Sequence, residues 1–84
     1  MEQFETGMMA RSQSGHDAGN VYVIIKVEEA YVYLVDGKVR TLDKPKKKKK
    51  KHVQLIKESF DIQGATDVDI KRWIKIWNKE DNQN

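Results

Sequence analysis

Alternating apolar and polar residues in the first two thirds of the chain predict a small antiparallel sheet. Val21 to Val27 places β-branched residues at every second position, and Tyr31 to Val35 continues the apolar pattern after a short break. The dipeptide Asp36-Gly37 is a strong hairpin signal. Further strands are expected in three segments: Met8 to Gln13, Lys38 to Leu42 and Val53 to Ile56. The pattern therefore predicts about five short strands.

Both faces of the central strands carry apolar side chains, with Val21 and Val23 on one face and Tyr22 and Ile24 on the other. A sheet with one face in water does not need this, whereas a curled barrel with another element packed outside it does. The predicted fold class is therefore mainly β, a small antiparallel barrel of about five strands with one C-terminal α-helix.

That helix is predicted from Asp67 to about Lys79. Thr66 is a suitable N-cap, and Asp67 and Asp69 lie in the first turn, where their charges complement the helix dipole. The apolar residues that recur at helical spacing are Ile70, Trp73, Ile74 and Trp77. We expect this stripe to pack on the barrel. The resulting organisation is a barrel at 4–57, a linker at 58–65, the helix at 66–80 and a frayed end at 81–84.

The positive charge of this 84-residue chain is concentrated in one segment. The chain has 16 Lys and Arg against 13 Asp and Glu, which gives a net charge of +3. Without the six lysines from Lys46 to Lys51, 10 basic residues remain against the same 13 acidic ones. The rest of the chain is therefore acidic, and any attraction for a polyanion is expected at the lysine run.

Composition and motifs argue against an enzyme, a cofactor or a metal site. The chain has no cysteine, which excludes disulfides and thiolate ligands and suits the cytoplasm. His16 and His52 are far apart in sequence, no Ser/His/Asp grouping has motif spacing, and no Walker-type loop is present. His16-Asp17 is a weak pair for a metal, and we expect Asp17 to cap its own turn instead. The longest apolar stretch, Val21 to Ile25, is too short to span a bilayer, and the first residues do not resemble a signal peptide.

The aromatic residues have two interpretations each. Tyr22, Tyr31 and Tyr33 suit either a half-buried core or base stacking, and the core interpretation is favoured. Trp73 and Trp77 suit the buried stripe of the helix. A basic helix with two tryptophans also suits a protein-interaction or membrane-surface adaptor, which is the alternative function.

The lysine run suits either a solvated charge block, such as a nuclear-localisation signal, or a phosphate-binding loop. Strand-like segments bracket it, and Pro45 biases Lys44 towards extended backbone. Six extended residues span roughly 20 Å, which is enough to follow several phosphates of one nucleic-acid backbone. We therefore expect a charged loop between two strands that contacts phosphates without reading bases.

The loop SGHDAGN, residues 14–20, resembles a KOW motif, in which a glycine between two strands is near-invariant; Gly19 matches that glycine and Gly15 the one that opens the loop. The continuation YVYLVDGKVRTLDKPKKKKKKHVQLI is similar to ribosomal large-subunit protein fourteen-e and its short bacterial relatives, which carry a "VDGK" hairpin, a lysine-rich loop and a "KH". The resemblance covers about residues 4–57. It implies an SH3-like (KOW) barrel, RNA binding and association with the ribosome.

The chain departs from the KOW pattern at the positions beside the loop glycines. KOW loops commonly carry Lys or Arg there, whereas this loop has His16, Ala18 and Asn20. The loop is therefore nearly neutral, and the contribution of positive charge is expected from Lys44 to Lys51 instead.

These observations predict a non-catalytic, cytoplasmic RNA-binding protein. Its expected partners are structured ribosomal RNA and neighbouring ribosomal proteins, with no small-molecule substrate and no membrane. The residues expected to contact RNA are Arg11, Ser14, Gly15, His16, Gly19, Asn20, Lys38, Arg40, Lys44, Lys46, Lys47, Lys48, Lys49, Lys50, Lys51 and His52.

Overall fold

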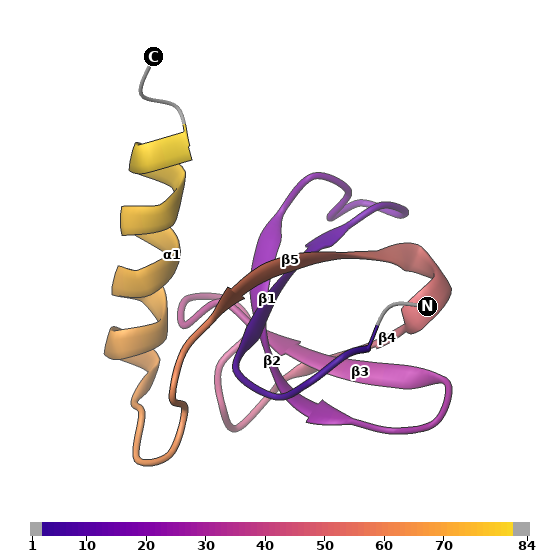
Figure 1. Cartoon of the computed structure of the whole chain (residues 1–84), viewed down its shortest axis with the longest axis horizontal. Helices are drawn as coiled ribbons and strands as arrows, with labels where there is room; N and C mark the ends of the chain where they lie inside the picture. The colour runs from indigo at the N-terminus through magenta and orange to yellow at the C-terminus, as the bar shows by residue number, and fades with distance from the viewer. Residues whose placement is uncertain (1–2, 82–84) are drawn as a thin grey trace.

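The computed structural model describes residues 3–81, which form one curved sheet and one α-helix (Figure 1). Five antiparallel strands pair in the order β4-β3-β2-β1-β5. In chain order the elements are β1 (Met8–Ser12), β2 (Val21–Val27), β3 (Tyr31–Val35), β4 (Lys46–Lys49), the 3₁₀ turn η1 (Lys50–His52), β5 (Val53–Ser59) and α1 (Asp67–Asp81). This confirms the prediction of a mainly β fold with five strands and a C-terminal helix. The curved sheet is compatible with a small barrel.

Alternation along the central strands divides the core into two apolar clusters. The first lies on one face of the sheet and contains Ala10, Tyr22, Ile24, Val32, Leu34, Val53 and Leu55. The second lies on the opposite face and contains Met9, Val21, Val23 and Val35, together with Ile70 of α1. Because both faces of β2 are covered, its residues Val21 to Ile24 are all buried. Burial on both faces explains the apolar residues at successive positions of this strand.

The predicted strand at Lys38 to Leu42 is wrong. Residues 36–44 form turns, and the partner of β3 is the lysine strand β4, with Leu34 opposite Lys46 and Tyr31 opposite Lys49. The hairpin signal at Asp36-Gly37 failed because the carboxylate of Asp36 accepts the backbone N–H groups of Lys38 and Arg40, which closes a longer turn. Pairing Lys38 to Leu42 with β3 would also add little apolar burial, since Val39 is 78% exposed.

The helix α1 begins with a reciprocal cap. The hydroxyl of Thr66 accepts the backbone N–H of Asp69, and the carboxylate of Asp69 accepts the N–H of Thr66. The backbone N–H and the hydroxyl of Thr66 both donate to the carboxylate of Asp69, and these two bonds lower the pKa of Asp69. Ile70 is fully buried against the sheet, and the ring of Trp73 stacks on Phe60 with 4.7 Å between centroids. The helix extends through Asp81, and the remainder of the expected frayed end, 82–84, lies outside the described residues.

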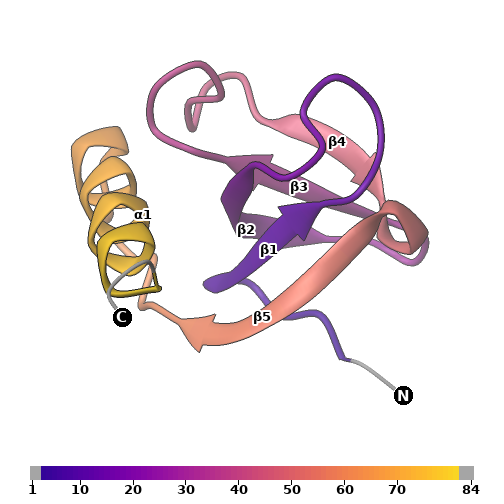
Figure 2. The ribbon, with the colours of Figure 1, turned by 90° about the horizontal axis from the view of Figure 1, so that it is seen from above.

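The turn at 36–44 is held against the start of α1. The N–H of Leu42 donates to the carboxylate of Asp67 over 2.8 Å. Gly37 has a φ of +79°, and a Cβ there would overlap the carbonyl oxygen of Asp67 and approach the backbone nitrogen of Lys71. Only glycine permits this approach. The turn and the helix are therefore fixed relative to each other (Figure 2).

Candidate nucleic-acid interface

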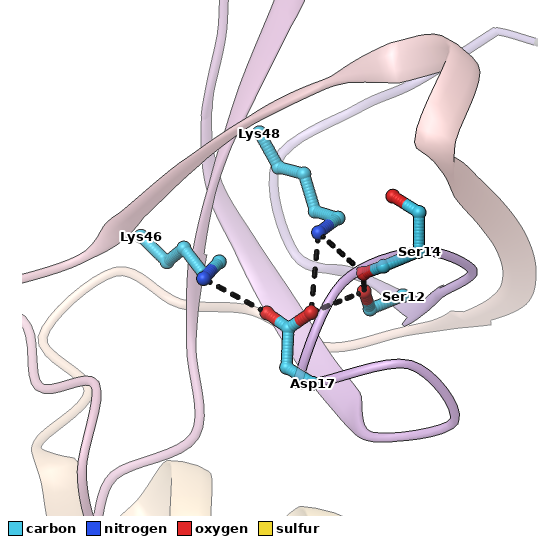
Figure 3. Close-up of polar contacts among 5 residues, drawn as sticks. All are labelled: Ser12, Ser14, Asp17, Lys46 and Lys48. Carbon is cyan, nitrogen blue, oxygen red and sulfur yellow. Dashed lines mark hydrogen bonds and ion pairs between the residues drawn. The ribbon is translucent and has the colours of Figure 1, made fainter.

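The carboxylate of Asp17 joins the glycine loop to the lysine strand (Figure 3). Its Oδ1 accepts a hydrogen bond from the Ser12 hydroxyl over 2.8 Å and lies 3.1 Å from Nζ of Lys48. Its Oδ2 lies 3.1 Å from Nζ of Lys46. Lys48 also donates to the carbonyl oxygen of Ser14 over 2.9 Å. Asp17 does not cap its own turn with its side chain, because three donors from β1 and β4 surround it.

The charge of Asp17 is stabilised despite its burial. Burial alone raises the pKa of this carboxyl, but hydrogen bonds from Ser12, Lys46 and Lys48 and the charge of Lys46 lower the pKa by more. The net result is a pKa far below the ordinary range for aspartate. At neutral pH Asp17 is therefore ionised and partly neutralises two of the six lysines.

The lysine strand presents its side chains alternately to two faces. Lys46 and Lys48 turn towards Asp17, and their side chains are only 28% and 11% exposed. Lys47 and Lys49 are exposed on the other face. Four of the six lysines in the run thus form a strand with two differently placed sets of amines, where a charged loop was expected. The period-2 geometry of a strand accounts for this division.

The outer face of β3 and β4 combines lysines with aromatic rings. Tyr33 lies opposite Lys47, and Tyr31 lies opposite Lys49. Nζ of Lys47 is 4.4 Å from the centroid of the Tyr31 ring and 5.9 Å from that of Tyr33. Both rings are half-buried and lie outside the two apolar clusters, whereas Tyr22 is a core residue. We call the set Tyr31, Tyr33, Lys47 and Lys49 the tyrosine–lysine strip.

Further cations lie at both ends of β4. Lys44 precedes it and Lys51 follows it, and both are exposed. Lys50 is half-buried, with Nζ 5.6 Å from the ring centroid of Phe4, and His52 is half-buried too. Positive charge therefore continues beyond the tyrosine–lysine strip at both ends of β4.

The glycine loop lies beside β4. The contacts of Lys48 with Ser14 and of Lys46 with Asp17 hold it there. Gly15, His16, Gly19 and Asn20 are exposed. The structure thus brings the KOW-like loop and the lysine run together, although the two are about thirty residues apart in sequence.

Three of the residues expected to contact RNA lie elsewhere. Arg11 is on β1 beneath α1, with Cζ 5.6 Å from the ring centroid of Trp77, and its buried Nε has no hydrogen-bond partner among residues 3–81. Lys38 and Arg40 belong to the turn beside the helix. The structure does not bring these three side chains to the tyrosine–lysine strip.

Sequence reasoning missed two contributions to this surface. One is the outward position of the β3 tyrosines, for which a half-buried core was favoured over base stacking: Tyr31 and Tyr33 are half-buried as expected, but they lie outside both apolar clusters, whereas Val32, Leu34 and Val35 are the buried residues of that strand. The other is the pairing of Asp17 with lysines more than 25 positions away, for which the only signal was an acidic residue in an otherwise neutral loop.

Comparison with known proteins does not identify the chain: no protein-family model matches it, and no curated protein matches it. Within residues 3–81 no helix is long and apolar enough to cross a membrane. The same residues hold no group of three or more His, Cys, Asp or Glu side chains placed to bind a metal ion. The interface described above is therefore the basis for any functional conclusion.

Proposed function

We propose that the protein is a non-catalytic RNA-binding protein that holds RNA against the tyrosine–lysine strip. The observation that carries this proposal is the register of β3 and β4, which sets each of two outward tyrosines opposite an exposed lysine. Aromatic rings interleaved with cations are the usual means by which proteins bind exposed bases and the phosphates between them.

The two residue types have separate tasks on this surface. Lys47 and Lys49 would contact phosphates, and each contact releases counterions from the RNA. Tyr31 and Tyr33 would stack on bases that are not enclosed in a helix. Lys44 and Lys51 would extend the phosphate contacts beyond the strip. Lys46 and Lys48 would act indirectly, because Asp17 holds them.

The glycine loop favours RNA as the nucleic acid. Residues 14–20 resemble a KOW loop, and the structure places this loop next to β4. KOW-domain proteins bind RNA, which the basic strip alone does not distinguish from DNA. We therefore propose structured ribosomal RNA as the target, with neighbouring ribosomal proteins as further contacts and the cytoplasm as the location.

Binding to a labelled ribosomal RNA fragment, followed by fluorescence anisotropy over a range of salt concentrations, tests this proposal. With three or four phosphate contacts, affinity should fall roughly 50-fold between 50 and 200 mM salt. Affinity that stays flat over this range contradicts the proposal. Crosslinking in cells should then recover ribosomal RNA above its abundance background.

The adaptor function has less support from the structure. Trp73 stacks on Phe60, and Trp77 packs against Arg11 of β1, so both indole rings face the sheet. The exposed apolar residues of the helix are Val68 and Ile76, which are two turns apart. Ile76 lines a groove with Phe60, Trp73 and Trp77, but its volume of about 140 Å³ is below the usual range for ligand sites.

A further inference from the structure

A groove lies between α1, the turn at 36–40 and the end of the glycine loop. Its volume is about 640 Å³, which is within the range of small-ligand sites. Lys71 and Lys75 line it from the helix, Lys38 and Val39 from the turn, and Gly19 and Asn20 from the loop. Three segments that are distant in sequence therefore build one concave surface.

The charge of this groove favours an anion. Lys38, Lys71 and Lys75 line it, and none of them forms an ion pair with a carboxylate of the described residues. The acidic residue in the lining is Asp36, whose Oδ1 accepts the backbone N–H groups of Lys38 and Arg40. The carboxylate is thus engaged by its own turn. Three lysines and one aspartate therefore line the groove, and the resulting net positive charge attracts a phosphate.

The rest of the lining suits a base more than a simple anion. Val39 is 78% exposed, and Ile74 and Val21 continue the apolar surface. Asn20 and Asn78 add amide groups, each of which both donates and accepts hydrogen bonds, as the edge of a base requires. A Cβ at Gly19 would meet no atom within 4 Å, so the loop leaves open space at this end. An acidic peptide would use the amines but not the apolar surface.

We propose that this groove binds one unpaired nucleotide, with its phosphate on Lys71 and Lys75 and its base on Val39 and Ile74. The part of this inference that takes RNA as the source of the nucleotide rests on the proposed function. The strip and the groove lie at the two ends of one chain segment, since Tyr33 and Asp36 are three residues apart, about 10 Å at strand rise. A strand of RNA therefore reaches the groove one or two nucleotides beyond the strip.

The groove is preformed by backbone contacts. Gly37 packs against the first turn of α1, and Leu42 donates to Asp67, which fixes the turn that carries Lys38 and Val39. A fixed backbone lowers the ordering cost of binding to that of the exposed side chains in the lining. Replacement of exposed side chains in the lining is therefore expected to leave the fold intact, so that such variants report on binding.

NMR titration of the ¹⁵N-labelled protein with nucleoside 5′-monophosphates tests the proposal, with the free nucleosides and inorganic phosphate as comparison ligands. The expected result is a saturable shift of the amides of Asn20, Val39 and Asn78 that is strongest with the monophosphates. The variant Lys71→Gln/Lys75→Gln should weaken this binding roughly tenfold, as expected for the loss of charge-assisted contacts. Inorganic phosphate that binds as tightly as a monophosphate, or a nucleoside that does so, overturns the proposal.

The matched control is Arg72→Gln/Lys79→Gln, which removes the same charge from the same helix outside the groove lining. It should leave monophosphate binding unchanged; equal weakening by both variants shows general electrostatic attraction and overturns the proposal. Val39→Ser should weaken binding of the monophosphate but not of inorganic phosphate. Since Val39 is exposed, this variant is expected to fold.

An RNA hairpin with an unpaired loop and a fully paired duplex of the same stem distinguish the two sources of the nucleotide. Shifts at the groove with the hairpin but not the duplex identify an unpaired nucleotide of RNA. If no RNA binds while monophosphates still shift the groove, the proposed function fails and a free nucleotide is the ligand. If RNA binds through the strip and no ligand shifts the groove, the proposed function stands and this inference fails.

Discussion

Nζ of Lys48 lies 3.1 Å from Oδ1 of Asp17, and the two side chains are only 11% and 12% exposed. Their contact spans 31 positions of the chain. It fastens the loop between β1 and β2 to the strand β4, with the Ser12 hydroxyl on the same oxygen. A basic segment that would repel itself in isolation is therefore held in part by a single carboxylate.

Replacement of Asp17 by asparagine should lower the free energy of unfolding by about 2 kcal/mol, because Lys46 and Lys48 would lose their counter-charge in a partly buried site. Urea unfolding followed by circular dichroism measures the change. Asp43→Asn is the matched control, since Asp43 is exposed and has no side-chain hydrogen bond within the described part of the chain. An equal loss in both variants would show that the Asp17 contacts contribute nothing.

The stability difference between the native protein and Asp17→Asn should depend on pH. Burial raises the pKa of Asp17, but Ser12, Lys46 and Lys48 lower it by more, so the folded pKa lies below the value of about 3.9 in the unfolded chain. The carboxylate therefore stabilises the fold above pH 4, and this contribution declines as the pH falls towards the folded pKa. The difference should be constant from about pH 5 to 7 and shrink between about pH 4 and 2. Urea unfolding of both proteins at several pH values measures this difference. A difference that does not shrink below about pH 4 contradicts the prediction.

The two sets of lysines in β4 should respond differently to neutralisation. Lys47→Gln/Lys49→Gln should lower RNA affinity and reduce the salt slope by roughly 2, with stability nearly unchanged, because these amines are exposed. Lys46→Gln/Lys48→Gln should mainly lower stability, because it leaves Asp17 without its partners. Anisotropy and urea unfolding on both variants separate the two effects. If both double variants lose the same affinity and keep the same stability, the two faces of β4 do not differ in function.

The outward tyrosines should contribute to affinity without adding to the salt dependence. Tyr31→Leu/Tyr33→Leu removes both stacking surfaces and should weaken binding to single-stranded RNA by about thirtyfold or more, at roughly 1–3 kcal/mol for each of the stacked bases. The salt slope should stay the same, since no charge is removed. Anisotropy at two salt concentrations checks both expectations. Unchanged affinity would limit the interface to phosphate contacts.

Gly37→Ala should destabilise the protein by about 2 kcal/mol or more, because the new methyl group would overlap the backbone of α1 at a positive φ. Gly64→Ala is the matched control: Gly64 also has a positive φ, but a Cβ there meets nothing within 4 Å. It should show the backbone strain alone. Thermal unfolding of both variants gives the comparison, and similar losses would mean that the close approach of turn and helix is unimportant.

The sequence was sufficient to predict the elements that depend on strong local signals. Val21–Val27 and Tyr31–Val35 have the predicted bounds, because β-branched and aromatic residues alternate between clear breaks. The helix begins at the predicted Asp67, where Thr66 and Asp69 form the cap. Local chemistry determines these features, so they are visible without the fold.

The lysine strand was not predicted, because nothing local marks it. Six identical charged residues carry no periodicity, and lysine is depleted in strands. Their conformation follows from tertiary contacts. The lysines pair with β3 as a strand, and Lys46 and Lys48 form ion pairs with Asp17. The division of the run into inner and outer side chains follows from that pairing alone. The candidate interface was thus located by the sequence, while its arrangement required the structure.

The position of β4 has a consequence for solubility. It ends the sheet, with β3 on one side and no strand of the described residues on the other. A strand at the edge of a sheet is a template for pairing with another molecule, and lysine side chains are a common means of preventing that. Four lysines in a row make two such edges repel each other. In the absence of RNA, this repulsion is expected to prevent two molecules from pairing edge to edge.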